Sequence, residues 1–210
     1  MTPLTAPVPL RAAKPDALVA NVLDAWDGTS EDQRARGAQW YRVANQLARQ
    51  MAGGDARTGA GVIAALSAQA SWERNTRDAA ALLAGRPVLN TRERLAKAHR
   101  ILAGEDPDDV LPRGLKTWHF YRCIADPDDA AAVVIDRHAH DLAVGRRLGT
   151  AYRGLGYRPR YDLFAGAYRA AAGQLGVLPS TLQAATWLAW TEDPRRPARP
   201  HHRSTEGDAA

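Results

Sequence analysis

The chain has 210 residues with a hydrophobic fraction of 45%, enough for one domain with a substantial core. Its formal net charge is +5, and all but three of its 28 Lys and Arg residues are arginine, the cation that suits phosphate binding. A single cysteine, Cys123, excludes an internal disulfide and an iron–sulfur cluster. No apolar run approaches the roughly 18 residues of a membrane span, and prolines interrupt the N-terminal segment where a signal peptide is continuously apolar, so we expect a cytoplasmic protein without a membrane partner.

Both ends differ in composition from the rest of the chain. Residues 1–15 are rich in proline, and the segment 192–210 is a basic tail, so we expect both to be disordered. Residues 16–191 are predicted to form one all-α domain. The apolar content is mostly alanine, with only two Phe and two Met, which favours close helix–helix packing.

The first half of this domain is marked by helical periodicity and capping residues. Leu18, Val22, Leu23 and Trp26 predict a first amphipathic helix. The segment 30–33, SEDQ, has the form of a capping box, and it opens a second helix with apolar residues at helical spacing. Those residues are Trp40, Val43, Leu47 and Met51. The run 59–69 predicts a helix that is buried on most sides and ends near Ser67 to Ala70.

The second half continues as helices separated by turns. Ser71 is expected to cap the next helix, and residues 90–104 predict another that stops at a glycine. A turn with Pro and Gly then precedes a helix beginning near Leu115. The run 131–135, AAVVI, has no partner strand, so we interpret it as an extended connector into a helix after Asp136. Two last helices are predicted over 161–175 and 179–191, the second starting at Pro179 or Ser180.

Three fragments contain the residues suited to catalysis or binding: LSAQ (66–69), LPRGLKT (111–117) and IDRH (135–138). In this order they resemble the helix-hairpin-helix DNA glycosylases of the endonuclease III type. In that superfamily a Leu-Ser-x-Gln element ends an apolar helix, a Leu-Pro-Gly-x-Gly-x-Lys-Thr hairpin follows, and a Val-Asp-x-His segment opens a later helix. The fragments are also similar to a group of phage and actinobacterial proteins without a settled function. The resemblance covers about residues 59–149.

The resemblance implies a DNA partner and a role for each matching residue. Asp136 is the catalytic carboxylate, beside a sugar carbon that becomes oxocarbenium-like. Lys116 is the nucleophile of a lyase step if burial lowers its pKa. Gln69 fills the gap left by an extruded base, and Trp72 or Tyr121 stacks on that base. The remaining residues expected to bind DNA or substrate are Asn75, Arg113, Gly114, Thr117, Arg137 and His138, with some of Arg146, Arg147 and Arg153 at the border of the cleft.

The hairpin departs from the family pattern, because RGLK keeps only Gly114 and lacks one residue. Backbone N–H groups beside the two usual glycines bind a DNA phosphate, and Arg113 can partly substitute for that contact. The cysteine-rich cluster loop of one subgroup is absent. We expect no cofactor and no metal, because His138, His140 and Asp141 diverge on a regular helix.

Each residue also has a structural interpretation. Asp136 is equally a helix N-cap, Lys116 a solvated residue of a first turn, and Gln69 and Asn75 partners of loop backbone groups. The tryptophans are expected in the core or in a groove wall. These residues are Trp40, Trp118, Trp187 and Trp190.

The leading hypothesis is a DNA base N-glycosylase, with or without lyase activity, that acts on a damaged or modified base. One alternative is an enzyme of the same fold that modifies a base in a phage-type hypermodification pathway without excising it. Another is a DNA-binding module without catalysis, which the shortened hairpin favours. A monomer is the starting assumption, and we expect Lys116, Asp136 and Gln69 to meet across one cleft.

Overall fold

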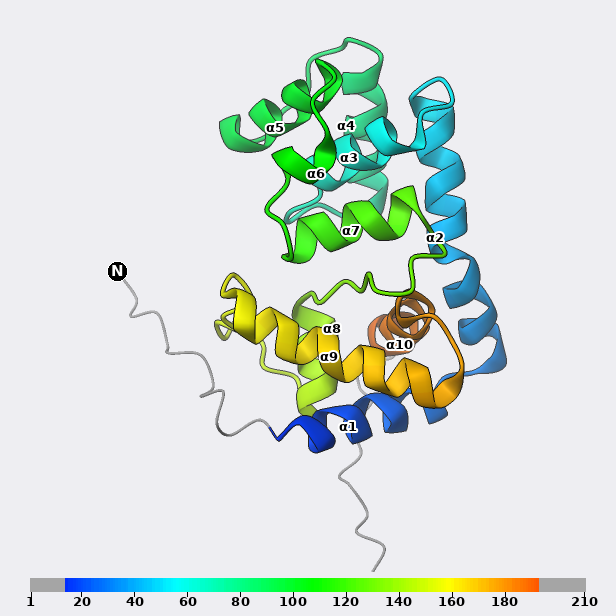
Figure 1. The fold of residues 1–210 in the computed structure, drawn as a ribbon. Helices are drawn as coiled ribbons and strands as arrows, with labels where there is room; N and C mark the ends of the chain where they lie inside the picture. Colours follow the sequence, from blue (N-terminus) through cyan, green and yellow to red (C-terminus); the bar gives the residue numbers. More distant parts are fainter. Residues whose placement is uncertain (1–13, 193–210) are drawn as a thin grey trace, which may run out of the picture.

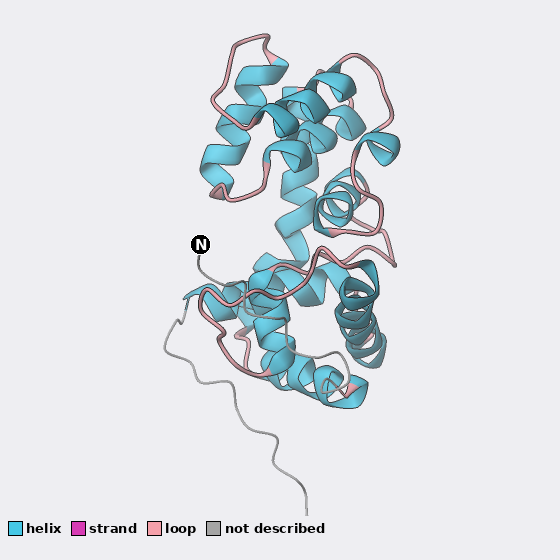
Figure 2. Ribbon diagram, turned by 90° about the vertical axis from the view of Figure 1, so that its left-hand side faces the viewer, coloured by secondary structure: helices cyan, strands magenta, loops and turns pink. Residues whose placement is uncertain are grey.

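The computed structural model describes residues 14–192, which form ten helices joined by loops and contain no strand (Figures 1 and 2). The predicted all-α class is therefore confirmed. The disorder expected for residues 1–15 and 192–210 lies mostly outside the described residues, but Pro15 begins α1 and Glu192 ends α10, so the helical part extends one residue further at each end than predicted. The helices are α1 (Pro15–Asp27), α2 (Glu31–Met51), α3 (Ala56–Leu66), α4 (Trp72–Leu83), α5 (Arg92–Leu102), α6 (Pro107–Val110), α7 (Lys116–Ala125), α8 (Arg137–Val144), α9 (Arg158–Leu175) and α10 (Pro179–Glu192).

Capping residues set several helix starts as the sequence indicates. The N–H of Gln33 donates to Ser30 Oγ at 3.1 Å and the N–H of Ser30 donates to Gln33 Oε1 at 3.0 Å, so the predicted capping box is present. Ser71 Oγ accepts the N–H of Arg74 at the start of α4. Helix α9 begins three residues earlier than expected, because Pro159 fits its first turn.

The helices pack around two apolar clusters. The first cluster is formed by α3–α7 with the C-terminal part of α2 and contains Ile63, Leu66 and Ile124. The second cluster is formed by α1, α8, α9 and α10 and contains Val22, Phe164 and Leu182. Helix α2 runs alongside both groups in Figure 1 and packs closely against α10.

Small residues form the packed face of α2. Its buried residues are Gly37, Tyr41, Ala44 and Ala48. A Cβ on Gly37 would lie 2.6 Å from the backbone N of Ala185, so only glycine allows α10 this close. The larger residues at the predicted spacing flank this face, and Val43 is 58% exposed. The helix is as predicted, but its contact face is set by the small residues, which agrees with the close packing expected from the alanine content.

An extended connector, residues 132–135, runs between the two groups of helices (Figure 1). Its side chains alternate, because successive residues of extended backbone point to opposite sides. Ala132 and Val134 pack into the first cluster, whereas Val133 and Ile135 pack into the second. The predicted connector is therefore confirmed, and it delivers Asp136 to the place where the two clusters meet.

Candidate functional site

Asp136 is the first residue after the connector and the N-cap of α8. Its Oδ1 accepts the backbone N–H groups of His138 at 2.9 Å and Ala139 at 2.8 Å. Its Oδ2 forms no hydrogen bond with any of residues 14–192, and the side chain is half-buried. The capping interpretation is thus correct, and it uses one of the two carboxylate oxygens.

Three buried tyrosines surround the start of α8. The Tyr161 hydroxyl accepts the N–H of Ile135 at 2.9 Å and donates to the carbonyl of Val133 at 3.0 Å, and the Tyr168 hydroxyl donates to the carbonyl of Ala139. Burial raises the pKa of Tyr41, Tyr161 and Tyr168, and the negative charge of Asp136 raises the pKa of each further. The carboxylate therefore lies within electrostatic range of all three hydroxyls.

His138 and Trp187 lie beside this carboxylate. The His138 Nε2 accepts from the Nε of Arg137 at 3.1 Å, and the ring meets Trp187 edge-on at 6.5 Å. Burial lowers the pKa of His138, while the Asp136 charge opposes that effect. A neutral imidazole and a half-buried indole thus form one side of the surface around Asp136.

An aromatic cluster, Trp40, Tyr41, Trp72 and Phe120, joins α2, α4 and α7. Ring centroids are 5.0 Å apart for Trp40 and Trp72, 6.2 Å for Trp40 and Phe120, and 6.5 Å for Tyr41 and Phe120. Trp40, Trp72 and Phe120 are only half-buried. Burial raises the pKa of Tyr41 and the Asp136 charge raises it further, so Asp136 lies within electrostatic range of this one member of the cluster.

Gln69 lies in the turn that leads to this aromatic cluster. It is exposed, and its φ of 60° is the only left-handed value of a non-glycine residue within the described chain. An unfavourable backbone conformation of this kind costs of order 1 kcal/mol and is often found at functional sites. The structure therefore presents Gln69 on the surface three residues before Trp72.

Lys116 is the first residue of α7, and Thr117 is the second. Residues i and i+4 share one helix face, so Lys116 lies on the face of α7 that carries Phe120 of the aromatic cluster. The Lys116 Nζ forms no hydrogen bond or ion pair with any residue from 14 to 192, Asp136 included. Both Lys116 and Thr117 are half-buried.

The hairpin before α7 is covered by an arginine from α9. Gly114 has a φ of 74°, and a Cβ there would lie 2.2 Å from the guanidinium carbon of Arg158. Arg113 donates from its Nε to the carbonyl of Asp108 at 2.8 Å and pairs with Asp109 at 2.7 Å. No side chain caps α7 at Leu115. Two exposed arginines therefore flank an uncapped helix start.

Two expected contact residues lie in the interior. Tyr121 is 1% exposed, under the guanidinium of Arg57 at 5.7 Å. Asn75 is 3% exposed, and its Nδ2 donates to the carbonyl of Ile63 at 3.1 Å. Both side chains are therefore buried, Tyr121 within the first cluster. Asn75 binds a backbone carbonyl, as its structural interpretation predicts.

The expected border arginines divide into two groups. Arg137 and Arg146 are exposed, beside or beyond α8. Arg153 binds both carboxylate oxygens of buried Asp141, at 2.7 and 2.6 Å, and Arg147 lies 3.9 Å above the Trp190 ring. The latter two have structural roles in holding the loop after α8.

Sequence reasoning gave no site role to Tyr41, Gln183 or Arg158. The Tyr41 hydroxyl donates to Gln183 Oε1 at 3.0 Å, which links α2 to α10. One sequence feature could have indicated Gln183: it is a polar residue one helical turn before Trp187 in the apolar run LQAATWLAW. Nothing in the sequence indicates that Arg158 meets Gly114.

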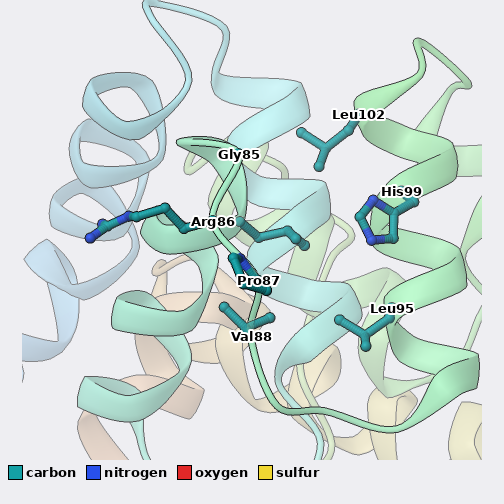
Figure 3. A pocket seen from close by; sticks show the side chains of 8 residues that line it. Gly85, Arg86, Pro87, Val88, Leu95, His99 and Leu102 are labelled. Carbon is teal, nitrogen blue, oxygen red and sulfur yellow. The ribbon is translucent and has the colours of Figure 1, made fainter.

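A separate pocket of about 410 Å³ opens between α4, α5 and the loop that joins them (Figure 3). Its lining is mainly apolar, with His99 between Leu95 and Leu102, while Arg86 points away (Figure 3). It contains none of the residues that the sequence assigns to a site.

The geometry defines an all-α protein with a capped aspartate between two helical clusters. Residues 7–194 match the model of DUF7178, described as a family of unknown function, and the chain belongs to this family. No curated protein and no solved structure matches the chain. Among residues 14–192, no helix combines the length and apolarity needed to cross a membrane.

Proposed function

We propose that the protein is a DNA base N-glycosylase whose catalytic carboxylate is Asp136. The observation that carries the proposal is the environment of Asp136: two backbone N–H groups fix the carboxylate through Oδ1, and Oδ2 has no hydrogen-bond partner among residues 14–192. A rigid carboxylate in a half-buried position stabilises positive charge on a sugar carbon without having to reorganise.

The reaction breaks the bond between C1′ of the deoxyribose and the base nitrogen. The base leaves with the bonding electron pair and gains a proton, while C1′ becomes oxocarbenium-like opposite the Asp136 carboxylate. Water then adds at C1′ and loses a proton, which yields an abasic site and free base. Three buried tyrosine hydroxyls keep their protons here because burial and Asp136 both raise their pKa values.

Lys116 supports an accompanying lyase step. Its Nζ forms no ion pair within the described residues, and it starts the helix face that leads to Phe120. The amine at this position attacks C1′ in place of water and loses a proton; the C1′–O4′ bond then breaks, O4′ takes a proton and a Schiff base remains. Loss of a C2′ proton then eliminates the 3′ phosphate.

The exposed turn and the aromatic cluster suit an unstacked base. Gln69 is held outward by its left-handed backbone, and Trp40, Trp72 and Phe120 offer half-buried ring surfaces nearby. Base–aromatic stacking contributes about 1–3 kcal/mol per base. Extrusion of a base requires such compensation for lost stacking in the duplex.

Exposed arginines suit the phosphate backbone. Arg113 and Arg158 flank the start of α7, and Arg137 begins α8 next to Asp136. We infer that Arg158 takes over the phosphate contact that the shortened hairpin cannot provide through a second glycine.

The test is incubation of the purified chain with duplexes that carry single damaged or modified bases, followed by mass spectrometry. Release of free base, abolished in Asp136→Asn, is the expected result. A base that changes mass while still attached to DNA would instead identify base modification, and binding without either product would identify a DNA-binding module.

A further inference from the structure

Gln183 is a polar side chain in an otherwise apolar part of α10. It is 5% exposed, and its Oε1 accepts the hydroxyl of Tyr41 at 3.0 Å. Its Nε2 forms no hydrogen bond with any of residues 14–192 and is not among the fully enclosed polar atoms that lack a partner. The amide donor therefore reaches an accessible surface from an almost buried side chain.

The hydrogen bond with Tyr41 sets the orientation of this amide. The Tyr41 hydroxyl donates to Gln183 Oε1. The carbonyl end of the amide faces Tyr41 in this bond, so the NH₂ end points away from it.

Gln183 lies one helical turn before Trp187, which reaches the start of α8. Residues i, i+3 and i+4 of a helix share one face, which groups Gln183 with Thr186 and Trp187. The ring of Trp187 meets that of His138 edge-on at 6.5 Å, and His138 lies in the first turn of α8. This face of α10 therefore adjoins the turn of α8 that Asp136 caps.

Gln183 is 5% exposed, so its side chain is withdrawn from most of the surrounding water. Polar groups in such positions are ordinarily hydrogen-bonded, so a donor without a partner among residues 14–192 calls for an explanation. An apolar residue would pack in an Ala-rich helix interface without leaving a donor unpaired. A ligand that offers an acceptor pairs this donor when it binds.

We propose that Gln183 is the specificity-determining residue of this site, and that its Nε2 donates a hydrogen bond to a carbonyl oxygen of the substrate base. The inference rests on the proposed glycosylase function, and it narrows the substrate to bases with an acceptor on the edge that faces α10. A site built to donate a hydrogen bond discriminates strongly against an analogue that lacks the acceptor, because the donor is then left unpaired.

The experiment compares wild type with Gln183→Met, a side chain of similar length without the amide. The probes are duplexes with one base from matched pairs that differ by a single carbonyl: hypoxanthine with purine, uracil with pyrimidin-2-one, and 8-oxoguanine with guanine. Base release is measured for each, and Kd is measured for a duplex with a tetrahydrofuran abasic analogue. The analogue reports DNA binding without a base.

Wild type is expected to favour one carbonyl-bearing base over its partner, and Gln183→Met to reduce that preference about tenfold or more. Affinity for the abasic duplex should stay within about twofold, because no base contacts the amide there. If Gln183→Met does not fold, as judged by its thermal unfolding, Gln183→Asn keeps the amide polarity while withdrawing the donor by one methylene.

An unchanged preference in a folded variant would overturn the inference and leave the glycosylase proposal standing. Wild-type protein that releases no base from any duplex would overturn the glycosylase proposal, and the role of Gln183 with it. The two failures are distinguishable, because the first requires active wild-type protein.

Discussion

The Oδ1 atom of Asp136 accepts the backbone N–H of Ala139 at 2.8 Å. The same atom accepts the N–H of His138, so the whole capping function rests on one oxygen. The capping role and the proposed catalytic role therefore do not compete for the same atom, and substitutions can separate the two.

Asp136→Asn is expected to fold normally and to lose nearly all base release. Asparagine keeps an acceptor at the Oδ1 position and caps as well as aspartate, so the free energy of unfolding should change by less than about 1 kcal/mol. The amide lacks the charge that stabilises an oxocarbenium, so the rate should fall by about 100-fold or more. Urea unfolding and single-turnover base release measure the two quantities.

Asp136→Ala is the matched control for the cap. It should lose activity and also about 1 kcal/mol of stability, because two N–H groups lose their acceptor. Undiminished base release by Asp136→Asn would return this residue to a purely structural role.

Lys116→Ala should abolish a covalent adduct with DNA. If the amine attacks C1′, borohydride reduces the resulting Schiff base and fixes protein to the oligonucleotide, which a denaturing gel resolves. Lys97→Ala is the control, because Lys97 pairs with Glu93 on α5 at 2.6 Å. Trapping that persists in Lys116→Ala, or that is lost in both variants, would remove Lys116 from the chemistry.

Arg158→Ala should weaken DNA binding and reduce its dependence on salt. The logarithm of the binding constant falls linearly with the logarithm of salt concentration, and loss of one phosphate contact lowers the slope by about 1. Arg100→Ala removes the same charge from α5, where the arginine pairs with Glu105, and should leave the slope unchanged. Equal effects of both substitutions would show that only net charge matters.

The buried side chain of His119 should make the folded protein less stable on mild acidification. It is 5% exposed, stacks on Tyr161 at 5.2 Å and joins α7 to α9. Burial, assisted by the charge of Arg169, lowers its pKa to about 4, below the 6.5 of an unfolded chain. The folded state thus resists a proton that the unfolded state binds, so stability is complete above about pH 6.5 and declines towards pH 4.

Between pH 7 and pH 5 this group should remove about 2 kcal/mol from the free energy of unfolding. His119→Phe abolishes that part of the decline, while the lowered pKa values of His138 and His140 still contribute in both proteins. Urea titrations at the two pH values give the comparison. A decline of the same size in His119→Phe would contradict the assignment.

Much of the fold follows from local sequence signals, because caps and periodicity act over a few residues. The capping box at Ser30, the cap at Ser71 and the connector before Asp136 were all predictable in this way. The packed face of α2 was not, because large apolar residues suggest a contact face whereas Gly37 and its small neighbours permit the closest approach.

The candidate site was predictable from the sequence only for residues whose structural role depends on their immediate neighbours in the chain. Asp136 as an N-cap and Gln69 on an exposed turn follow from their neighbours in sequence. The contact of Tyr41 with Gln183 joins residues 142 positions apart, and Arg158 meets a glycine 44 positions away. Such pairings depend on how whole helices pack, which local patterns do not encode.

The connector also determines how the chain tolerates changes in length. Ala132 and Val134 face one cluster and Val133 and Ile135 the other, so deletion of a single residue there would exchange the two sets. It would also rotate Asp136 away from the N–H groups that hold it. A substitution within residues 132–135 need only match the volume of the original side chain. The length of the connector, in contrast, is fixed because it positions the Asp136 carboxylate at its end.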